Sequence, residues 1–155
     1  MENSKRQTIT LSLTVSNADT AITFYEKVFG AKVDGPVMRG PDGKTVMHAE
    51  LLFGDTKIFL CDELPIMGVF SPTHYGGTSV SIYFQVPDVD KTFADAVAAG
   101  ATGKMPPSDA FWGERYAYIS DPFGHGWGLA APKEQLTHEQ IKERSAQFWK
   151  QPVNQ

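Results

Sequence analysis

Two segments of the chain share one order of residue patterns, and this repeat constrains the fold more than any other feature of the sequence. The first reads VSNADTAITFYEKVFGAKV (Val15–Val33), and the second reads VPDVDKTFADAVAAGATG (Val86–Gly103) with one residue deleted. When the two are aligned, Asn17 falls on Asp88. Repetition at this period predicts two similar structural units, each of which buries apolar surface against the other.

The strand that precedes each repeated helix alternates strictly between polar and apolar residues. Thr8–Val15 reads TITLSLTV, and Ser79–Val86 reads SVSIYFQV. Such alternation predicts a strand with one face on a core and the other face in a wetter environment. Asn17 and Asp88 are placed to cap the helices that follow. Glycines are expected to stop these helices: Gly30 and Gly100.

Extended segments follow each predicted helix. They lie at 31–38, 45–53 and 56–61 in the first unit, and at 101–104, 115–120 and 126–131 in the second. The stretch Pro65–Gly77 holds three glycines and two prolines and is predicted to be a loop between the units. The chain is therefore predicted to be a single α+β domain made of two βαβββ units, at about 8–63 and 78–132.

A further helix is predicted for 136–151. Thr137 and Gln140 have the spacing of a capping box, which marks a helix N-terminus. Ile141, Ser145 and Phe148 form a narrow apolar stripe on an otherwise charged helix. We expect this stripe to pack on its own domain, and a contact with a partner subunit is the alternative.

Composition excludes several functional classes. The 155 residues carry a net charge of −4 with scattered basic residues, so no nucleic-acid partner is expected. The segment MENSKRQ lacks an apolar region, and no apolar run reaches membrane-spanning length. The single cysteine, Cys61, excludes an intramolecular disulfide and is expected to be an inert thiol. A cytoplasmic protein without a membrane partner is expected.

Several separated phrases carry a family resemblance: HAELLFGDTKIFLCDE (His48–Glu63), DAFWGERYAYISDPFGHGW (Asp109–Trp127) and LTHEQIKER (Leu136–Arg144). With the repeated units, they make the chain resemble the vicinal oxygen chelate superfamily, which includes glyoxalase I, the bleomycin resistance proteins and extradiol dioxygenases. Within it, the chain is most similar to the PhnB-like branch. The resemblance implies a glyoxalase/bleomycin-resistance-like fold, in which a curved mixed sheet surrounds a cleft and the helices lie outside.

The resemblance also implies where a metal ion would bind. Metal-dependent members use four side chains, typically His, Gln or Glu, from the first and last strands of each unit. The matching positions in this chain carry a hydroxyl, an alkyl group or no side chain: Thr10, Ser81, Ile58 (or Leu60 on the same face) and Gly128. These groups cannot supply the imidazole and carboxylate donors that hold transition metals. No metal at the usual site and no cofactor are therefore expected.

A displaced metal site is the alternative. His48 and Glu50 alternate onto one face of a predicted strand, which is a permissible spacing for a chelating pair. A surface His–Glu pair without a metal is the expected state, because no spacing such as HxH or HExxH supports a ligand set. A metal-dependent lyase, isomerase or dioxygenase that uses these residues is the rival function.

Aromatic and polar residues suit the binding of a ligand better than a reaction. Tyr83 and Gln85 share the open face of their strand, and Trp112 and Arg115 approach the next one. An arginine beside aromatic rings can hold a planar or anionic ligand. The alternative is that Arg115 pairs with Glu114, Asp109 or Asp121 and orders the loop. Trp127, by contrast, is predicted to lie in the core.

These observations favour a metal-independent protein that binds a small organic ligand in the cleft between the two units and forms a homodimer. The sequence assigns no catalytic residue. A structural or interaction module that uses the C-terminal helix is a third hypothesis. The residues expected to line the cleft come from both units: Thr10, Ser12, Ile58, Leu60, Ser81, Tyr83, Trp112 and Arg115.

Overall fold

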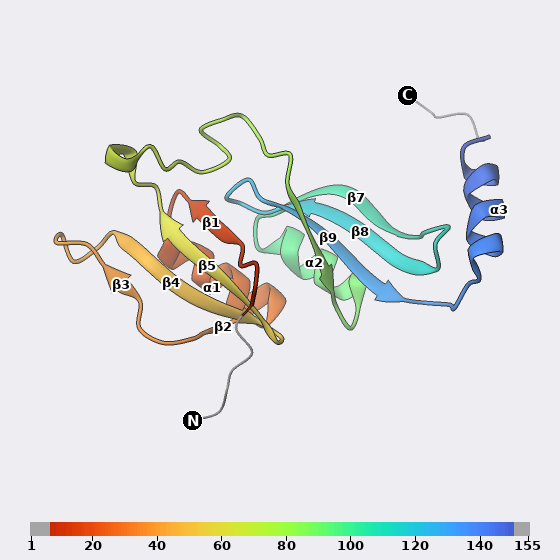
Figure 1. The fold of residues 1–155 in the computed structure, drawn as a ribbon, viewed down its shortest axis with the longest axis horizontal. Coiled ribbons are helices and arrows are strands. Elements are labelled where there is room, and N and C mark those ends of the chain that lie inside the picture. Colours follow the sequence, from red (N-terminus) through yellow and green to blue (C-terminus); the bar gives the residue numbers. More distant parts are fainter. Residues whose placement is uncertain (1–6, 151–155) are drawn as a thin grey trace. The chain divides into compact units, whose positions relative to one another are not determined.

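The chain is an α+β protein that divides into two compact units (Figure 1). This computed structural model describes residues 7–150. The first unit runs up to Val80 and also includes Pro122–His125, and the second contains Ser81–Asp121 and the chain from Gly126 onward. The turn between the last two strands of the second unit therefore belongs to the first unit.

The first unit is a mixed sheet with one helix. Its elements are β1 (Ser12–Val15), α1 (Ala18–Phe29), β2 (Lys32–Val33), β3 (Met38–Arg39), β4 (Val46–Phe53) and β5 (Thr56–Asp62). The sheet order is β1-β5-β4-β2, with β3 paired to β4. Strands β1 and β5 run parallel, and the other pairs are antiparallel. Strand β1 begins at Ser12, later than the predicted start at Thr8.

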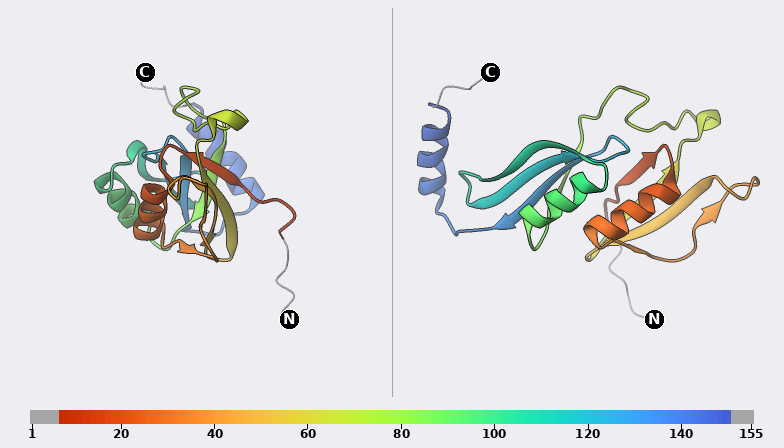
Figure 2. Two further views of the ribbon diagram at one scale, coloured as in Figure 1. Left: turned by 90° about the vertical axis from the view of Figure 1, so that its left-hand side faces the viewer. Right: turned by 180° about the vertical axis from the view of Figure 1, so that it is seen from behind.

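Helix α1 begins and ends at the residues expected from the sequence. The Asn17 side chain accepts a hydrogen bond from the backbone N–H of Thr20 at 2.9 Å, and Gly30 takes φ of 65° at the C-terminus. The helix lies along one face of the first sheet, as the views from two sides show (Figure 2). The fully buried Tyr25 ring contacts Phe53 of β4, at 5.7 Å between centroids. Burial of these rings holds the helix on the sheet.

The second unit repeats the plan, except that it has one long strand where the first unit has the two short strands β2 and β3. Its elements are β6 (Ser81–Gln85), α2 (Val89–Ala98), β7 (Thr102–Asp109), β8 (Glu114–Ser120), β9 (Gly126–Pro132) and α3 (His138–Phe148). The sheet order is β6-β9-β8-β7, with β6 and β9 parallel. Strand β7 extends beyond the predicted 101–104 through Pro106 and Pro107. Prolines fit there because β7 is an edge strand and its register shifts between Met105 and Ser108.

The core of the second unit contains Trp127, as predicted. Its side chain is completely buried, and its indole N–H donates to Asp121 Oδ2 at 2.9 Å. The carboxylate of Asp121 is 4% exposed, so the hydrogen bond satisfies a polar group that burial would otherwise penalise. The Phe84 ring packs edge-on against Trp127, at 6.1 Å between centroids.

Helix α3 begins at the predicted capping box. Thr137 and Gln140 exchange both hydrogen bonds of that motif. None of the helix residues is buried, and its contacts with the preceding chain are an Arg144–Glu134 ion pair and a ring contact between Phe148 and Phe111. No helix among residues 7–150 is both long enough and apolar enough to cross a membrane.

Candidate ligand-binding site

The second sheet presents one polar, exposed face, which follows from alternation along β6. Ser81, Tyr83 and Gln85 are exposed, whereas Ile82 and Phe84 point to the opposite face. The residues of β9 that pair with Ile82 and Phe84 are Trp127 and Leu129, and both are completely buried. We call the side that carries Tyr83 the open face of the second sheet.

Two tyrosines of β8 lie across glycines of β9 on this open face. Tyr118 is the register partner of Gly128, and Tyr116 is the partner of Ala130. A Cβ atom built on Gly126 would lie 2.0 Å from Tyr118 Oη, and one built on Gly128 would lie 2.8 Å from Tyr116 Oη. The two rings therefore occupy the space that side chains at the glycines would need.

Glu114, the first residue of β8, is the acceptor at the centre of this face. Its Oε2 accepts from the Trp112 indole N–H at 2.7 Å and from the Tyr83 hydroxyl, and its Oε1 accepts from the Gln85 amide at 3.0 Å. The Tyr116 ring stacks on Tyr83 at 5.7 Å and meets Trp112 edge-on at 5.5 Å. We call these five residues the Glu114 cluster: Tyr83, Gln85, Trp112, Glu114 and Tyr116.

Hydrogen bonding sets the charge of this cluster. Burial pushes the pKa of Glu114 upward, but the hydrogen bonds from Tyr83, Gln85 and Trp112 outweigh it, and the pKa lies below its ordinary value of 4.5. Burial, followed by the hydrogen bond to Glu114, raises the pKa of Tyr83 to about 12. At neutral pH the cluster therefore holds one carboxylate and neutral phenols.

Removing one donor is expected to raise the pKa of Glu114. In a Tyr83→Phe variant the carboxylate loses one of its three hydrogen bonds, so its pKa should move back toward 4.5. Because the folded-state pKa is depressed, the stabilisation is present above 4.5 and is lost as the pH falls through the folded-state pKa. A carbon-detected NMR titration of the glutamate carboxyls measures this change. Tyr75→Phe is the matched control, and an equal rise in both variants would contradict the assignment.

Arg115 does not join this cluster, in contrast to its expected place in the cleft. Its guanidinium donates to both oxygens of Asp90 at 2.7 and 2.9 Å and to Asp109 at 3.1 Å. Alternation along β8 explains the difference, because Arg115 points to the side opposite Glu114 and Tyr116. Hydrogen bonds from the guanidinium to the two carboxylates raise the pKa of Arg115 further. The alternative interpretation, in which Arg115 pairs with Asp109, is confirmed.

Ile58 and Leu60 also differ from their expected place in the cleft. Their side chains are 3% and 1% exposed and share a face with their β4 partners Leu51 and Ala49. This face packs under α1, so both residues belong to the core of the first unit. The opposite face of β5 presents Phe59, which is paired in parallel with Ser12 of β1.

The other predicted site residues lie on or beside open sheet faces. Ser12 is the exposed first residue of β1, and Thr10 precedes that strand and is half-buried. Ser81 is the exposed first residue of β6, two residues before Tyr83. Tyr83 and Trp112 are brought together by Glu114, a residue that the sequence had suggested only as a partner of Arg115.

The residues of the first unit do not fit a transition metal. His48 and Glu50 do lie together, with 3.4 Å between Nε2 and Oε1. However, the ammonium of Lys57 lies 2.5 Å from Glu50 and 2.8 Å from Asp34, so both carboxylates are already engaged in ion pairs. Within residues 7–150, no group of three His, Cys, Asp or Glu side chains is arranged to hold a metal ion. At Gly128 the Tyr116 ring fills the space of a ligating side chain.

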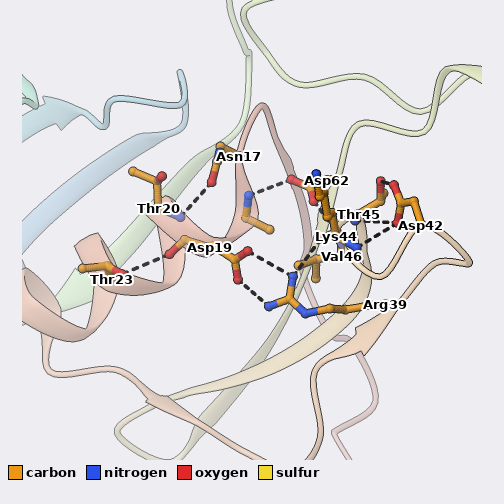
Figure 3. Close-up of polar contacts among 11 residues, drawn as sticks. Asn17, Asp19, Thr20, Thr23, Arg39, Asp42, Lys44, Thr45, Val46 and Asp62 are labelled. Atoms are coloured by element: carbon orange, nitrogen blue, oxygen red, sulfur yellow. Dashed lines mark hydrogen bonds and ion pairs between the residues drawn. The ribbon is translucent and has the colours of Figure 1, made fainter.

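A polar hollow of about 450 Å³ opens beside the N-terminus of α1. Figure 3 shows the polar contacts of Asp19 and Asp62, which line it. The carboxylates of the hollow are already engaged by the protein. Asp19 forms a two-pronged ion pair with Arg39, Asp62 accepts from two backbone N–H groups, and Glu63 accepts from Ser71. The carboxylates of the hollow are therefore held by the protein itself, whereas the Glu114 cluster leaves Tyr83 exposed and Trp112 and Tyr116 half-buried.

Sequence comparison identifies the class of protein to which this fold belongs. The chain is a member of the Glyoxalase/Bleomycin resistance protein/Dioxygenase superfamily, whose family model matches residues 8–129. An uncharacterized protein of Mycobacterium bovis is 41% identical over 133 residues, which cover 84% of this chain and 86% of the relative. The family resemblance inferred from the sequence is confirmed.

Solved structures have the same fold. TioX from Micromonospora sp. ML1 is 26% identical with a TM-score of 0.59, and the match covers 84% of this chain and all of TioX. The PhnB protein from Bacillus cereus is 20% identical with a TM-score of 0.63, over 81% of this chain and 99% of the PhnB chain. The predicted α+β, glyoxalase-like fold is confirmed by these neighbours and by the two sheets.

Proposed function

We propose that this protein binds a small organic ligand, without a metal ion, on the open face of the second sheet. The observation that supports this proposal is the Glu114 cluster. Three aromatic side chains stand around one carboxylate, and Tyr83 is 53% exposed. Exposed aromatic surface next to a fixed polar group is typical of a site that orients a small molecule. The cleft shared by both units stays a prediction.

A ligand screen tests this proposal. Thermal-shift and native mass-spectrometry measurements over a broad panel of metabolites and antibiotics are expected to yield at least one ligand. Its binding should weaken at least tenfold in a Trp112→Ala variant, because a ring that covers the ligand is lost. Trp149→Ala, which removes an exposed ring of the C-terminal segment, is the matched control. A panel without any ligand would refute the proposed function.

The rival function is a metal-dependent lyase, isomerase or dioxygenase. It requires His48 and Glu50 to release Lys57 and recruit further donors. Metal analysis of protein purified without chelators separates the two hypotheses. We expect no stoichiometric transition metal. A stoichiometric metal that is lost in a His48→Ala variant would favour the enzyme.

We also propose that the protein is a cytoplasmic homodimer and that α3 contributes to its interface. The helix has no buried residue, and Phe148 and Trp149 are 51% and 71% exposed. Covering these rings would remove apolar surface from water. Sedimentation analysis of a chain that ends at Thr137 is expected to show a monomer with ligand binding intact. A dimer of unchanged stability would exclude this role for the helix.

A further inference from the structure

The two sheets differ in how they bind one exposed-side carboxylate: Glu50 in the first sheet has a cationic partner, and Glu114 in the second has neutral donors. In the first unit, Glu50 of β4 forms an ion pair with Lys57, whose ammonium lies 2.5 Å from the Glu50 Oε2 atom. In the second unit, the donors to Glu114 of β8 among the described residues are neutral: a phenol, an indole and an amide. Within residues 7–150, no ammonium or guanidinium forms an ion pair with Glu114. The nearest arginine in sequence, Arg115, is engaged by Asp90 and Asp109 on the opposite side of the strand.

Three features of the Glu114 cluster therefore attract positive charge. The carboxylate is ionised at neutral pH. Its two oxygens offer about four acceptor positions, of which three are used, so one remains for a further donor. The aromatic faces of Tyr83, Trp112 and Tyr116 are electron-rich and bind cations while disfavouring anions.

We propose that the ligand of the Glu114 cluster is an organic cation that carries a flat ring. The positive group would lie at Glu114, and the ring would lie against the exposed Tyr83 and the half-buried Trp112. This inference rests on the proposed function and specifies its ligand class. It also replaces the expectation of an anionic ligand, which depended on Arg115 lying on the open face.

Three flat probes that differ in charge test this inference: N-methylquinolinium (cation), quinoline (neutral at neutral pH) and 2-naphthoate (anion). Titration calorimetry with the full chain is expected to show that the cation binds at least tenfold more tightly than the anion. N-methylquinolinium has no hydrogen-bond donor, so its preference over the anion comes from Coulomb attraction to the Glu114 carboxylate and from cation–π contact with the rings. Tighter binding of 2-naphthoate, or equal binding of all three probes, would overturn the inference.

Isosteric substitution locates the charge that is responsible. Glu114→Gln removes the charge at nearly constant shape, and it is expected to weaken N-methylquinolinium binding at least tenfold while leaving quinoline binding within about threefold. Glu139→Gln, on the exposed first turn of α3, makes the same change in net charge and should leave both affinities unchanged. Equal cation affinity in the Glu114→Gln variant and the wild type would refute the assignment.

A pH titration of the wild-type protein tests the same point without a substitution. N-methylquinolinium has no titratable group, so a change in its affinity reports on the protein. The titratable groups that face Glu114 are Tyr83 and Tyr116, whose pKa values are raised above 10.0, so both stay neutral. Affinity should hold above pH 4.5 and fall as Glu114 is protonated below it. Affinity that stays constant through this range would contradict the proposal.

The outcomes separate the inference from the function on which it rests. If neither these probes nor the broad ligand panel binds, the proposed function and the inference both fail. If the panel yields only neutral or anionic ligands at the Glu114 cluster, the function stands and the inference fails. Cationic ligands whose affinity depends on Glu114 would support both.

Discussion

Replacing Asp62 by alanine is expected to lower the free energy of unfolding by about 3 kcal/mol, because two backbone N–H groups lose a charged acceptor. The carboxylate accepts from the N–H of Ala18 at 2.7 Å and from that of Val46 at 2.7 Å (Figure 3). Ala18 begins α1 and Val46 begins β4, and both residues are buried. One side chain thus joins the helix N-terminus to the sheet at a place where water cannot easily substitute for it.

Denaturant unfolding of two further variants makes this test specific. Asp62→Asn keeps one acceptor oxygen but turns an amide group toward the second N–H, so about half of the loss is expected. Asp55→Ala removes an exposed carboxylate from the β4–β5 turn and should change stability by no more than about 0.5 kcal/mol. If Asp62→Ala is as stable as Asp55→Ala, the bridging role is wrong.

Replacing Gly126 by alanine is expected to destabilise the protein by about 2 kcal/mol through overpacking. The new Cβ would lie 2.0 Å from Tyr118 Oη and 2.9 Å from Tyr118 Cζ, so the ring must move. Because Gly126 is buried and β9 is paired on both sides, the backbone cannot retreat easily. Denaturant unfolding monitored by circular dichroism measures the loss.

Two comparisons isolate the ring as the cause. Adding Tyr118→Phe to Gly126→Ala removes the 2.0 Å contact and should recover part of the lost stability. Gly40→Ala is the control, since its Cβ would find no atom closer than 3.5 Å and its φ is not positive. Equal effects at Gly126 and Gly40 would show that the close approach of Tyr118 has no energetic consequence.

Much of the fold could be predicted from local sequence patterns. Asn17, Gly30 and Thr137 act where the capping rules place them, because a cap depends on atoms within a few residues. The sequence SVSIYFQV also predicted which residues of β6 share a face, since its polar and apolar residues alternate without a break. The repeat predicted three strands after each helix; the second unit has three, whereas the first has four, because the segment predicted at 31–38 forms the two short strands β2 and β3. The length of β7 was missed: it continues through Pro106 and Pro107, which an edge strand tolerates.

The site could be predicted only in part. Strand β5 reads TKIFLCD, in which apolar residues are nearly continuous, so period-two alternation cannot choose between the face of Ile58 and the face of Phe59. The choice requires the pairing with β4 and β1. The tyrosines of β8 posed the same problem: once Tyr116 is placed on the open face, alternation assigns Glu114 to it and Arg115 to the other side. That alternation was the signal that would have identified Glu114.

The turn Pro122–His125 has a consequence for the order in which the chain can complete its structure. It lies between β8 and β9 in sequence but belongs to the first unit, where Phe123 contacts Phe24 and Tyr25 at 6.1 Å between ring centroids. When only the residues up to Val80 have emerged from the ribosome, the core of the first unit therefore still lacks the Phe123 ring. The aromatic core of the first unit can therefore be completed only after the chain has been synthesised through Phe123, although the repeat makes each unit look self-sufficient.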